Sequence, residues 1–161
     1  MDHLPSLNLP PYAPRLRRGT RHSEIFDSLR GRFVALTPEE WVRQCFVNHL
    51  IVTLGYPRGL MANEVGIKLN DTQRRCDTVV YSRAGMRPLM VVECKAPHVA
   101  ITQKVFDQIA RYNVVVGARW LVVTNGLSHY CCEFTPEGTY RFLREIPRYE
   151  EIVRSWLRVK S

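Results

Sequence analysis

The sequence lacks any long apolar stretch. Its longest apolar runs are far shorter than the roughly 20 residues that a membrane-spanning helix needs. The N-terminus, from Met1 to Pro5, has no apolar core of the kind that a secretory signal contains. We therefore expect a cytoplasmic protein with no membrane partner.

Metal-binding cysteine spacings are also missing. The chain has five cysteines, an odd number, and no Cys-x-x-Cys or Cys/His spacing typical of zinc sites. Cys76, Cys94 and Cys131 lie in apolar stretches typical of strands, so we expect buried, reduced thiols. A Gly-x-x-x-x-Gly-Lys-Ser/Thr phosphate loop is absent, which excludes an ATP-driven motor within these residues. No recognised helix-turn-helix or zinc-finger pattern indicates which bases would be read.

The bulk composition is that of a globular protein. The chain has 161 residues, of which 45% are hydrophobic and 24% charged, so one domain with a real core is expected. It contains no internal repeat and no low-complexity segment. The net charge of +8 favours a polyanionic partner, with nucleic acid first. A basic soluble protein without such a partner is the alternative.

Residues 1–37 differ from the rest. Prolines there disfavour helix, and four arginines form a basic cluster; these are Pro5, Pro10, Pro11 and Pro14, and Arg15, Arg17, Arg18 and Arg21. We predict an extended Pro/Arg-rich N-terminal arm over 1–37, with a short strand at its end over 33–36, followed by a single domain over 38–161. The arm either contacts phosphates or only packs on the domain.

Hydrophobic periodicity predicts a mixed α/β sheet. Thr37 is a good helix N-cap followed by Pro38, and apolar residues recur at helical spacing to Val52. Strands are expected over 64–69, 76–82 and 89–95, then a helix over 102–116. The wholly apolar stretch 120–124 predicts a strand covered on both faces. Strands over 129–134 and 139–143 and a helix over 149–159 complete the order, which implies a crossover helix.

Charged residues occur inside two of these apolar strands. Asp77 lies in one, and Glu93 and Lys95 lie in the next. An ionised group in such a place is costly unless it is paired or binds a metal. Because side chains alternate along a strand, Glu93 and Lys95 share a face and Cys94 points the other way. If the two strands pair as a hairpin, Asp77 lies beside Glu93.

Two carboxylates and an ammonium group at one point suit metal-dependent phosphodiester hydrolysis. Mg²⁺ takes oxygen ligands from one or two carboxylates and keeps several waters. Asp77 and Glu93 are the expected ligands, and the backbone carbonyl of Cys94 adds a third oxygen. Lys95 would hold the attacking water or offset charge in the transition state. The alternative is a structural ion pair at a strand end. A Cys94 thiol nucleophile with His98 as its base is a further alternative that the strand-and-loop placement does not support.

Four motifs, in order along the chain, carry a family resemblance. They are Asn63-Glu64-Val65, Arg75-Cys76-Asp77, Val92-Glu93-Cys94-Lys95-Ala96-Pro97 and Asp107-Gln108-Ile109-Ala110-Arg111-Tyr112. Asp77 with Glu93-x-Lys95 resembles the PD-(D/E)XK nuclease motif. The four together resemble the N-terminal nuclease domain of type I restriction enzyme R subunits, over roughly 38–130. The resemblance implies a restriction-endonuclease-like core of the order αβββαβ.

The resemblance also implies residue roles. Asp77 and Glu93 match the metal ligands, and Lys95 matches the catalytic lysine. Gln108 and Tyr112 match a Gln-x-x-x-Tyr motif that supports the active site and DNA contact, and Glu64 matches an acidic position that can help to bind metal. We therefore expect catalytic roles for Asp77, Glu93, Lys95 and Gln108, and DNA contacts from Tyr112, Lys104, Arg111 and Arg75, the lysine and arginines being chosen for their place near the site.

The function expected from these residues is a Mg²⁺- or Mn²⁺-dependent DNA endonuclease without a helicase motor. The alternative is a non-cutting DNA-binding module, or a partner-dependent interaction module, with the same fold. The expected partners are DNA and other restriction-system subunits. A homodimer is one way in which both strands of a duplex would be cut.

Overall fold

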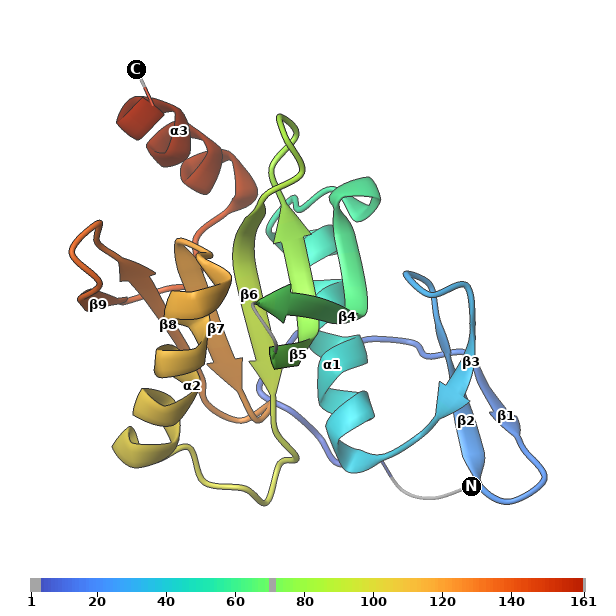
Figure 1. Cartoon of the computed structure of the whole chain (residues 1–161). Coiled ribbons are helices and arrows are strands. Elements are labelled where there is room, and N and C mark those ends of the chain that lie inside the picture. Colours follow the sequence, from blue (N-terminus) through green and yellow to red (C-terminus); the bar gives the residue numbers. More distant parts are fainter. Residues whose placement is uncertain (1–3, 70–71, 161) are drawn as a thin grey trace.

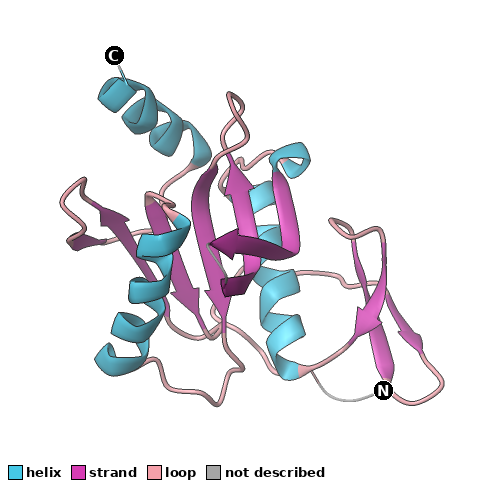
Figure 2. Cartoon of the chain, viewed as in Figure 1, coloured by secondary structure: helices cyan, strands magenta, loops and turns pink. Residues whose placement is uncertain are grey.

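A computed structural model of the chain describes residues 4–69 and 72–160, and it confirms the predicted α/β class. A mixed six-stranded sheet has the strand order β4-β5-β6-β7-β8-β9, and a separate three-stranded sheet has the order β1-β2-β3 (Figures 1 and 2). The strands of the large sheet are β4 (Met61–Leu69), β5 (Thr72–Tyr81), β6 (Pro88–Cys94), β7 (Trp120–Thr124), β8 (His129–Phe134) and β9 (Tyr140–Leu143).

Three α-helices accompany the large sheet: α1 (Pro38–Asn48), α2 (Gln103–Val116) and α3 (Tyr149–Lys160). Thr37 caps α1 as predicted, and Thr102 caps α2 in the same way. The hydroxyl of Thr37 accepts a hydrogen bond from the Glu40 amide at 3.0 Å, and that of Thr102 accepts one from the Val105 amide at 3.2 Å. These bonds satisfy amide groups that lack a partner within the helix, so they fix where each helix begins. A single π-helical turn, η1 (His49–Thr53), extends α1, and a short 3₁₀ turn, η2 (Arg58–Leu60), leads into β4.

The sheet contains one parallel pair. Strands β4, β5 and β6 are joined as antiparallel neighbours, whereas β6 and β7 are parallel and are connected through α2. A parallel connection needs a crossover of this length. Strands β8 and β9 then follow as antiparallel neighbours. The core order αβββαβ expected from the resemblance is therefore the order of α1, β4, β5, β6, α2 and β7.

The two faces of the large sheet carry two cores. On one face, Val42 and Phe46 of α1 pack with Val80 and Val92. On the other face, Phe106 and Ile109 of α2 pack with side chains of the strands that point away from α1, such as Val91. Figure 1 shows α1 and α2 on opposite sides of the sheet. Helices on both faces explain why β6 and β7 are almost wholly apolar.

The N-terminal segment differs from the extended arm that its prolines suggested. Its strands β1 (Leu16–Arg18), β2 (Ser23–Asp27) and β3 (Arg32–Ala35) form an antiparallel sheet whose inner face packs on α1. Ile25 and Val34 from this sheet contact Trp41 and Cys45 of α1. The prolines lie before β1, so they exclude helix there without preventing the hairpins that follow.

Among the helices of the described residues, none combines the length and the apolar character needed to cross a bilayer.

Candidate active site

Asp77 is held at the junction of β5 and β6. Its Oδ2 atom accepts a hydrogen bond from the Cys94 backbone amide at 2.8 Å. Thr78 pairs with Val92 in the antiparallel register, so the next position along each strand places Asp77 opposite Glu93. Opposed positions of antiparallel strands share a face. The antiparallel pairing on which the sequence prediction depended therefore forms, and Asp77 and Glu93 are the residues that follow its last pair.

Glu93 and Lys95 follow at the carboxyl end of β6. Glu93 is only 9% exposed and Lys95 is half-buried. The Lys95 amide donates to the Thr124 carbonyl at 2.8 Å, which ties this end of β6 to β7. Between them, the Cys94 side chain lies in the core under α1, and burial raises the pKa of its thiol well above the usual range. Cys94 thus contributes its backbone, not its thiol, to this corner.

Helix α1 adds Arg43, which the sequence analysis did not single out. The side chain of Arg43 is 5% exposed, and its Nη2 atom lies 2.6 Å from Oε1 of Glu64 and 3.7 Å from Oδ1 of Asp77. Burial by itself would lower the pKa of this guanidinium, but Glu40, Asp77 and Glu64 raise it. Arg43 is therefore a fixed positive charge between the sheet and the helix.

Glu39, on the first turn of α1, is a second residue that the sequence analysis did not assign to a site. Its pKa is raised, first by desolvation and then by the negative charge of Asp77, while Lys95 and Arg43 act in the opposite direction. Glu39 thus shares the electrostatic environment of the β5–β6 corner. The four-residue spacing of Glu39 and Arg43 places them on one helix face, which is the signal that could have found them.

Glu64 lies opposite Asp77 on β4 and has an unusual backbone. Its φ is +56°, in the left-handed region that non-glycine residues rarely adopt. Two arginines bind its carboxylate: Arg43 at 2.6 Å, and Arg75 at 3.3 Å through Nε. Strained backbone of this kind persists where the surroundings fix it, and it is frequent at functional sites. Glu39, Arg43, Glu64, Asp77, Glu93 and Lys95 are called the acidic corner below.

A chain of buried polar contacts joins the acidic corner to the N-terminal sheet. Asp27, fully buried on β2, accepts from Asn63 at 2.9 Å and pairs with Arg30. Arg30 also binds Glu40 at 2.6 Å, and Glu40 lies 3.4 Å from Nε of Arg43. The position of Arg43 at the acidic corner is thus supported from a sheet that is distant in sequence.

The residues expected on α2 lie at the surface of that helix. Gln108, Lys104 and Arg111 are exposed along the helix, and the Tyr112 ring is 45% exposed. Arg75 is 73% exposed and contacts the corner through Glu64. The structure therefore brings the residues expected on β4, β5 and β6 together with α1. It leaves the α2 residues on the surface, where a bound polyanion would be accessible to them.

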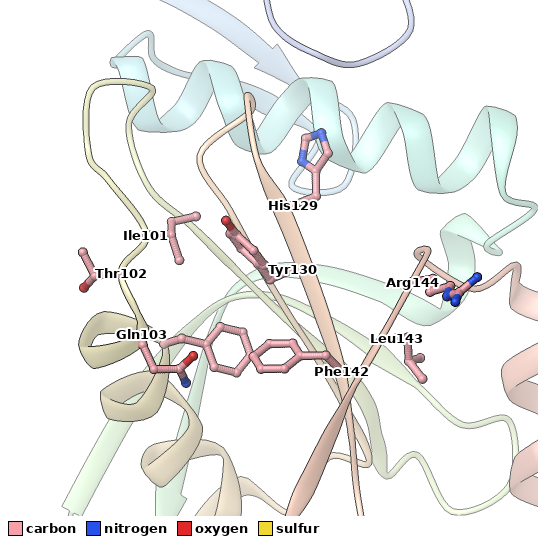
Figure 3. A pocket seen from close by; sticks show the side chains of 9 residues that line it. Ile101, Thr102, Gln103, His129, Tyr130, Phe142, Leu143 and Arg144 are labelled. Atoms are coloured by element: carbon pink, nitrogen blue, oxygen red, sulfur yellow. The ribbon is translucent and has the colours of Figure 1, made fainter.

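A pocket with a different lining lies elsewhere on the molecule. It has a volume of about 500 Å³ and opens between the start of α2 and strands β8 and β9. Phe106 and Phe142 both line it, with ring centroids 4.8 Å apart, and Figure 3 shows Gln103 and Arg144 on opposite sides of Phe142. None of the acidic-corner residues lines this pocket. Its lining includes His129, whose two ring nitrogens are held by Oγ1 of Thr124 at 2.7 Å and by the Asn8 carbonyl at 2.8 Å.

The donors at the acidic corner suit a hard cation. Asp77 keeps Oδ2 on the Cys94 amide and directs Oδ1 toward Arg43 at a distance too long for a hydrogen bond. Within residues 4–69 and 72–160, three or more His, Cys, Asp or Glu side chains do not converge as a ready-made metal cage. Mg²⁺ does not need such a cage, because one or two carboxylates, waters and substrate phosphates complete its coordination.

Comparison with known proteins gives one match. Residues 38–147 match the family described as type I restriction enzyme R protein N terminus. No curated protein and no solved structure matches the chain. The matched segment runs from the first residue of α1 to the residues just before α3, so it contains the whole acidic corner and more than half of the chain. With its αβββαβ core and its Asp77, Glu93 and Lys95 in the expected order, the chain belongs to the type I restriction enzyme R protein N terminus family.

Proposed function

We propose that the protein is a metal-dependent DNA endonuclease that hydrolyses phosphodiester bonds at the acidic corner and carries no motor within these residues. One arrangement supports the proposal: β5 and β6 pair in antiparallel fashion with Thr78 opposite Val92, Asp77 and Glu93 are the next residues along their strands, and Lys95 follows two residues after Glu93. Membership of the restriction-enzyme family supports a nuclease-related role.

The residues divide the chemical work by position. Asp77 and Glu93 would bind Mg²⁺ or Mn²⁺, together with the backbone carbonyl of Cys94, and Glu64 lies opposite Asp77 as an additional carboxylate. When bound, the ion supplies charge neutralisation at the phosphate and a more acidic water. The Cys94 amide fixes one oxygen of Asp77, so the carboxylate is oriented before any ligand arrives. Because the carboxylate is already oriented, less conformational entropy is lost when the ion binds.

Lys95 supplies the mobile positive charge. Its flexible stem places an ammonium group on the face shared by Glu93, where it would hold the attacking water and offset charge on the phosphate. Arg43 is held by Glu64, Glu40 and Asp77 and is nearly inaccessible to solvent. It therefore acts as a support for the carboxylates and not as a group that contacts the phosphate.

The exposed residues of α2 and β5 would contact the DNA. Gln108, Tyr112, Lys104 and Arg111 lie along one helix, and Arg75 lies beside Glu64 at the sheet. Their cationic members would bind phosphates, which position the substrate without reading its sequence. Other subunits of a restriction system are proposed partners, since the family is named for an enzyme with several kinds of subunit.

The test is cleavage of supercoiled plasmid DNA by the purified protein with Mg²⁺ or Mn²⁺. Glu93→Gln, Asp77→Asn and Lys95→Ala remove one proposed role each, and Glu137→Gln, in the exposed turn before β9, is the matched control. We expect metal-dependent cutting by the wild type and by the control. Each of the three corner variants should lose about 100-fold or more in rate. Equal cutting by the Glu93→Gln variant would refute this assignment of the site.

A second function, a DNA-binding module that does not cut, is favoured by the place of Arg43. Its guanidinium already lies 2.6 Å from Glu64 and 3.7 Å from Asp77, so a built-in cation partly neutralises the corner. In that case the wild type binds DNA in a salt-dependent way, and neither Mg²⁺ nor Mn²⁺ produces cutting. The same plasmid assay therefore separates the two functions.

A further inference from the structure

The outer face of the N-terminal sheet presents arginine and phenylalanine side chains together. Phe26 and Phe33 are cross-strand neighbours with ring centroids 5.3 Å apart. The Arg15 guanidinium lies 4.4 Å from the centre of the Phe26 ring, and that of Arg17 lies 4.0 Å from the centre of Phe33. A guanidinium stacked on a ring in this way presents its other flat side to a ligand. This outer face lies within residues 15–35, before the segment that matches the family.

Charge on this side of the molecule is strongly positive. Glu24, on the same strand as Phe26, is half-buried and paired with Arg17 at 2.8 Å. Six arginines are exposed here; they are Arg15, Arg17, Arg18, Arg21, Arg32 and Arg58. Aromatic rings combined with a cationic surface are what proteins use to bind single-stranded nucleic acid, because every base has a flat face that stacks and every nucleotide has a phosphate.

A pocket of about 260 Å³ opens beside Phe26, between the N-terminal sheet and α1. Arg15 and Arg58 are both among its lining residues. Aromatic rings and amide side chains also line it, from Tyr12, Phe26, Gln44 and Asn48. Amide groups can pair with the polar edge of a base, and the rings can stack on its face. A base within a paired duplex cannot enter such a pocket without being unstacked.

Helix α1 separates this pocket from the acidic corner. Gln44 and Asn48 line the pocket, whereas Glu39 and Arg43 belong to the corner. An α-helix with its side chains is roughly 10 Å across, so the two sites are about one helix diameter apart. Gln44 also donates to Glu40 at 3.1 Å, and Glu40 contacts Arg43.

We propose that this pocket and the arginine face beside it bind single-stranded DNA, with one base beside Phe26 and the adjacent phosphates on Arg15, Arg17 and Arg58. The inference rests on the proposed function in taking DNA as the polyanion, and it names the unpaired strand as the form that is bound. DNA binding is measured without metal. An absence of cleavage can therefore be distinguished from a failure of this surface to bind single-stranded DNA.

The experiment is fluorescence anisotropy in EDTA with a labelled thymidine oligonucleotide of about 20 nucleotides and a duplex of the same length, over a range of salt concentrations. The Arg15→Gln, Arg58→Gln double variant removes two phosphate contacts. Arg83→Gln, in the exposed turn between β5 and β6 at the far end of the large sheet, is the matched control for a single charge. Ser28→Ile narrows the pocket without altering charge.

We expect the single strand to bind more tightly than the duplex. The double variant should lose about 10-fold in affinity for the single strand and reduce the magnitude of its log–log salt slope by about 1.4. Ser28→Ile should weaken single-strand binding and leave duplex binding unchanged, and Arg83→Gln should change neither. Equal affinity of the protein for the single strand and for the duplex would overturn the proposal. An equal loss of single-strand affinity in Arg83→Gln and in the single variant Arg15→Gln would also overturn it. Circular dichroism of each variant establishes that a loss of binding is not a loss of folding.

Discussion

Nη2 of Arg43 on helix α1 lies 2.6 Å from Oε1 of Glu64 on strand β4. The guanidinium is 5% exposed and also faces Glu40 and Asp77, so it compensates several carboxylates that have little access to water. Breaking a buried pair by removing one partner is costly, because the remaining charges are left without compensation.

The Arg43→Met substitution should therefore lower the free energy of unfolding by about 3 kcal/mol, as measured by urea denaturation at neutral pH. The matched control is Arg75→Met, which removes the other arginine on Glu64. Arg75 is 73% exposed, so its loss should cost less than about 1 kcal/mol. Equal costs for the two variants would contradict the view that burial of Arg43 sets its importance.

Asp27 should make stability depend on pH in the acid range. Burial alone would raise the pKa of Asp27, but hydrogen bonds from Asn63 and Arg30 outweigh it and hold the pKa below its ordinary value of 3.8. A carboxyl group whose pKa is lowered by folding adds stability above the unfolded value, and this stability is lost as the pH falls through the folded value.

The unfolding free energy of Asp27→Asn should accordingly be about 3 kcal/mol below that of the wild type at neutral pH. The gap should narrow as the pH falls below the ordinary value of 3.8. Glu24→Gln, which removes the exposed pair with Arg17, should cost less than about 1 kcal/mol at either pH. A gap for Asp27→Asn that stays constant down to pH about 2 would argue against this linkage.

Glu39 should couple metal binding to pH. Desolvation and the negative charge of Asp77 raise the pKa of Glu39, so a proton competes there at a higher pH than at an ordinary glutamate. A cation at the acidic corner would displace that proton. Calorimetric titration with Mn²⁺ should give an affinity that weakens as the pH is lowered from 7 toward about 5.

In the Glu39→Gln variant this pH dependence should become flatter, and the affinity at neutral pH should be about 10-fold weaker. Glu150→Gln, at the exposed start of α3, serves as the control and should reproduce the wild-type titration. If Glu39→Gln also reproduces it, Glu39 does not take part in the corner.

The cysteines should be unreactive in the native protein. All five are buried, and desolvation raises the pKa of Cys45 to about 12 and that of Cys132 to about 12. Because the thiolate is the reactive form, a thiol reagent should label none of the five before unfolding and all five in denaturant. Cys94→Ala should keep the activity of the wild type, since Asp77 is held by the backbone amide at this position. Loss of activity in Cys94→Ala without loss of stability would revive the thiol mechanism.

Much of the fold could be predicted from the sequence because its local signals agree. Both helix caps, the apolar run over 120–124 and the alternation around Asp77 indicated elements that the structure contains with small shifts at their ends. The expectation that Asp77 lies beside Glu93 depended on an antiparallel pairing of their two strands, and that pairing forms up to Thr78 and Val92. The catalytic roles of these residues remain predictions.

Long-range packing could not be predicted in the same way. Arg43 and Glu39 reach the acidic corner because α1 crosses the sheet at a particular rotation, which depends on side chains from both elements. The N-terminal hairpins were missed because their proline-rich approach dominated the pattern. Alternation in Glu24, Ile25 and Phe26 was the available signal, and a three-residue strand such as β1 gives too little periodicity to detect.

Helix α1 has eight consecutive buried residues, from Glu40 to Val47. It is covered by the large sheet on one side, by the N-terminal sheet on another and by the acidic corner on a third. An ordinary surface helix accepts substitutions on every position that faces water, which gives a tolerance pattern with a period of 3.6 residues. Over two turns of α1 a saturation mutagenesis map should show no such period, because each step around the helix reaches a different tightly packed neighbour.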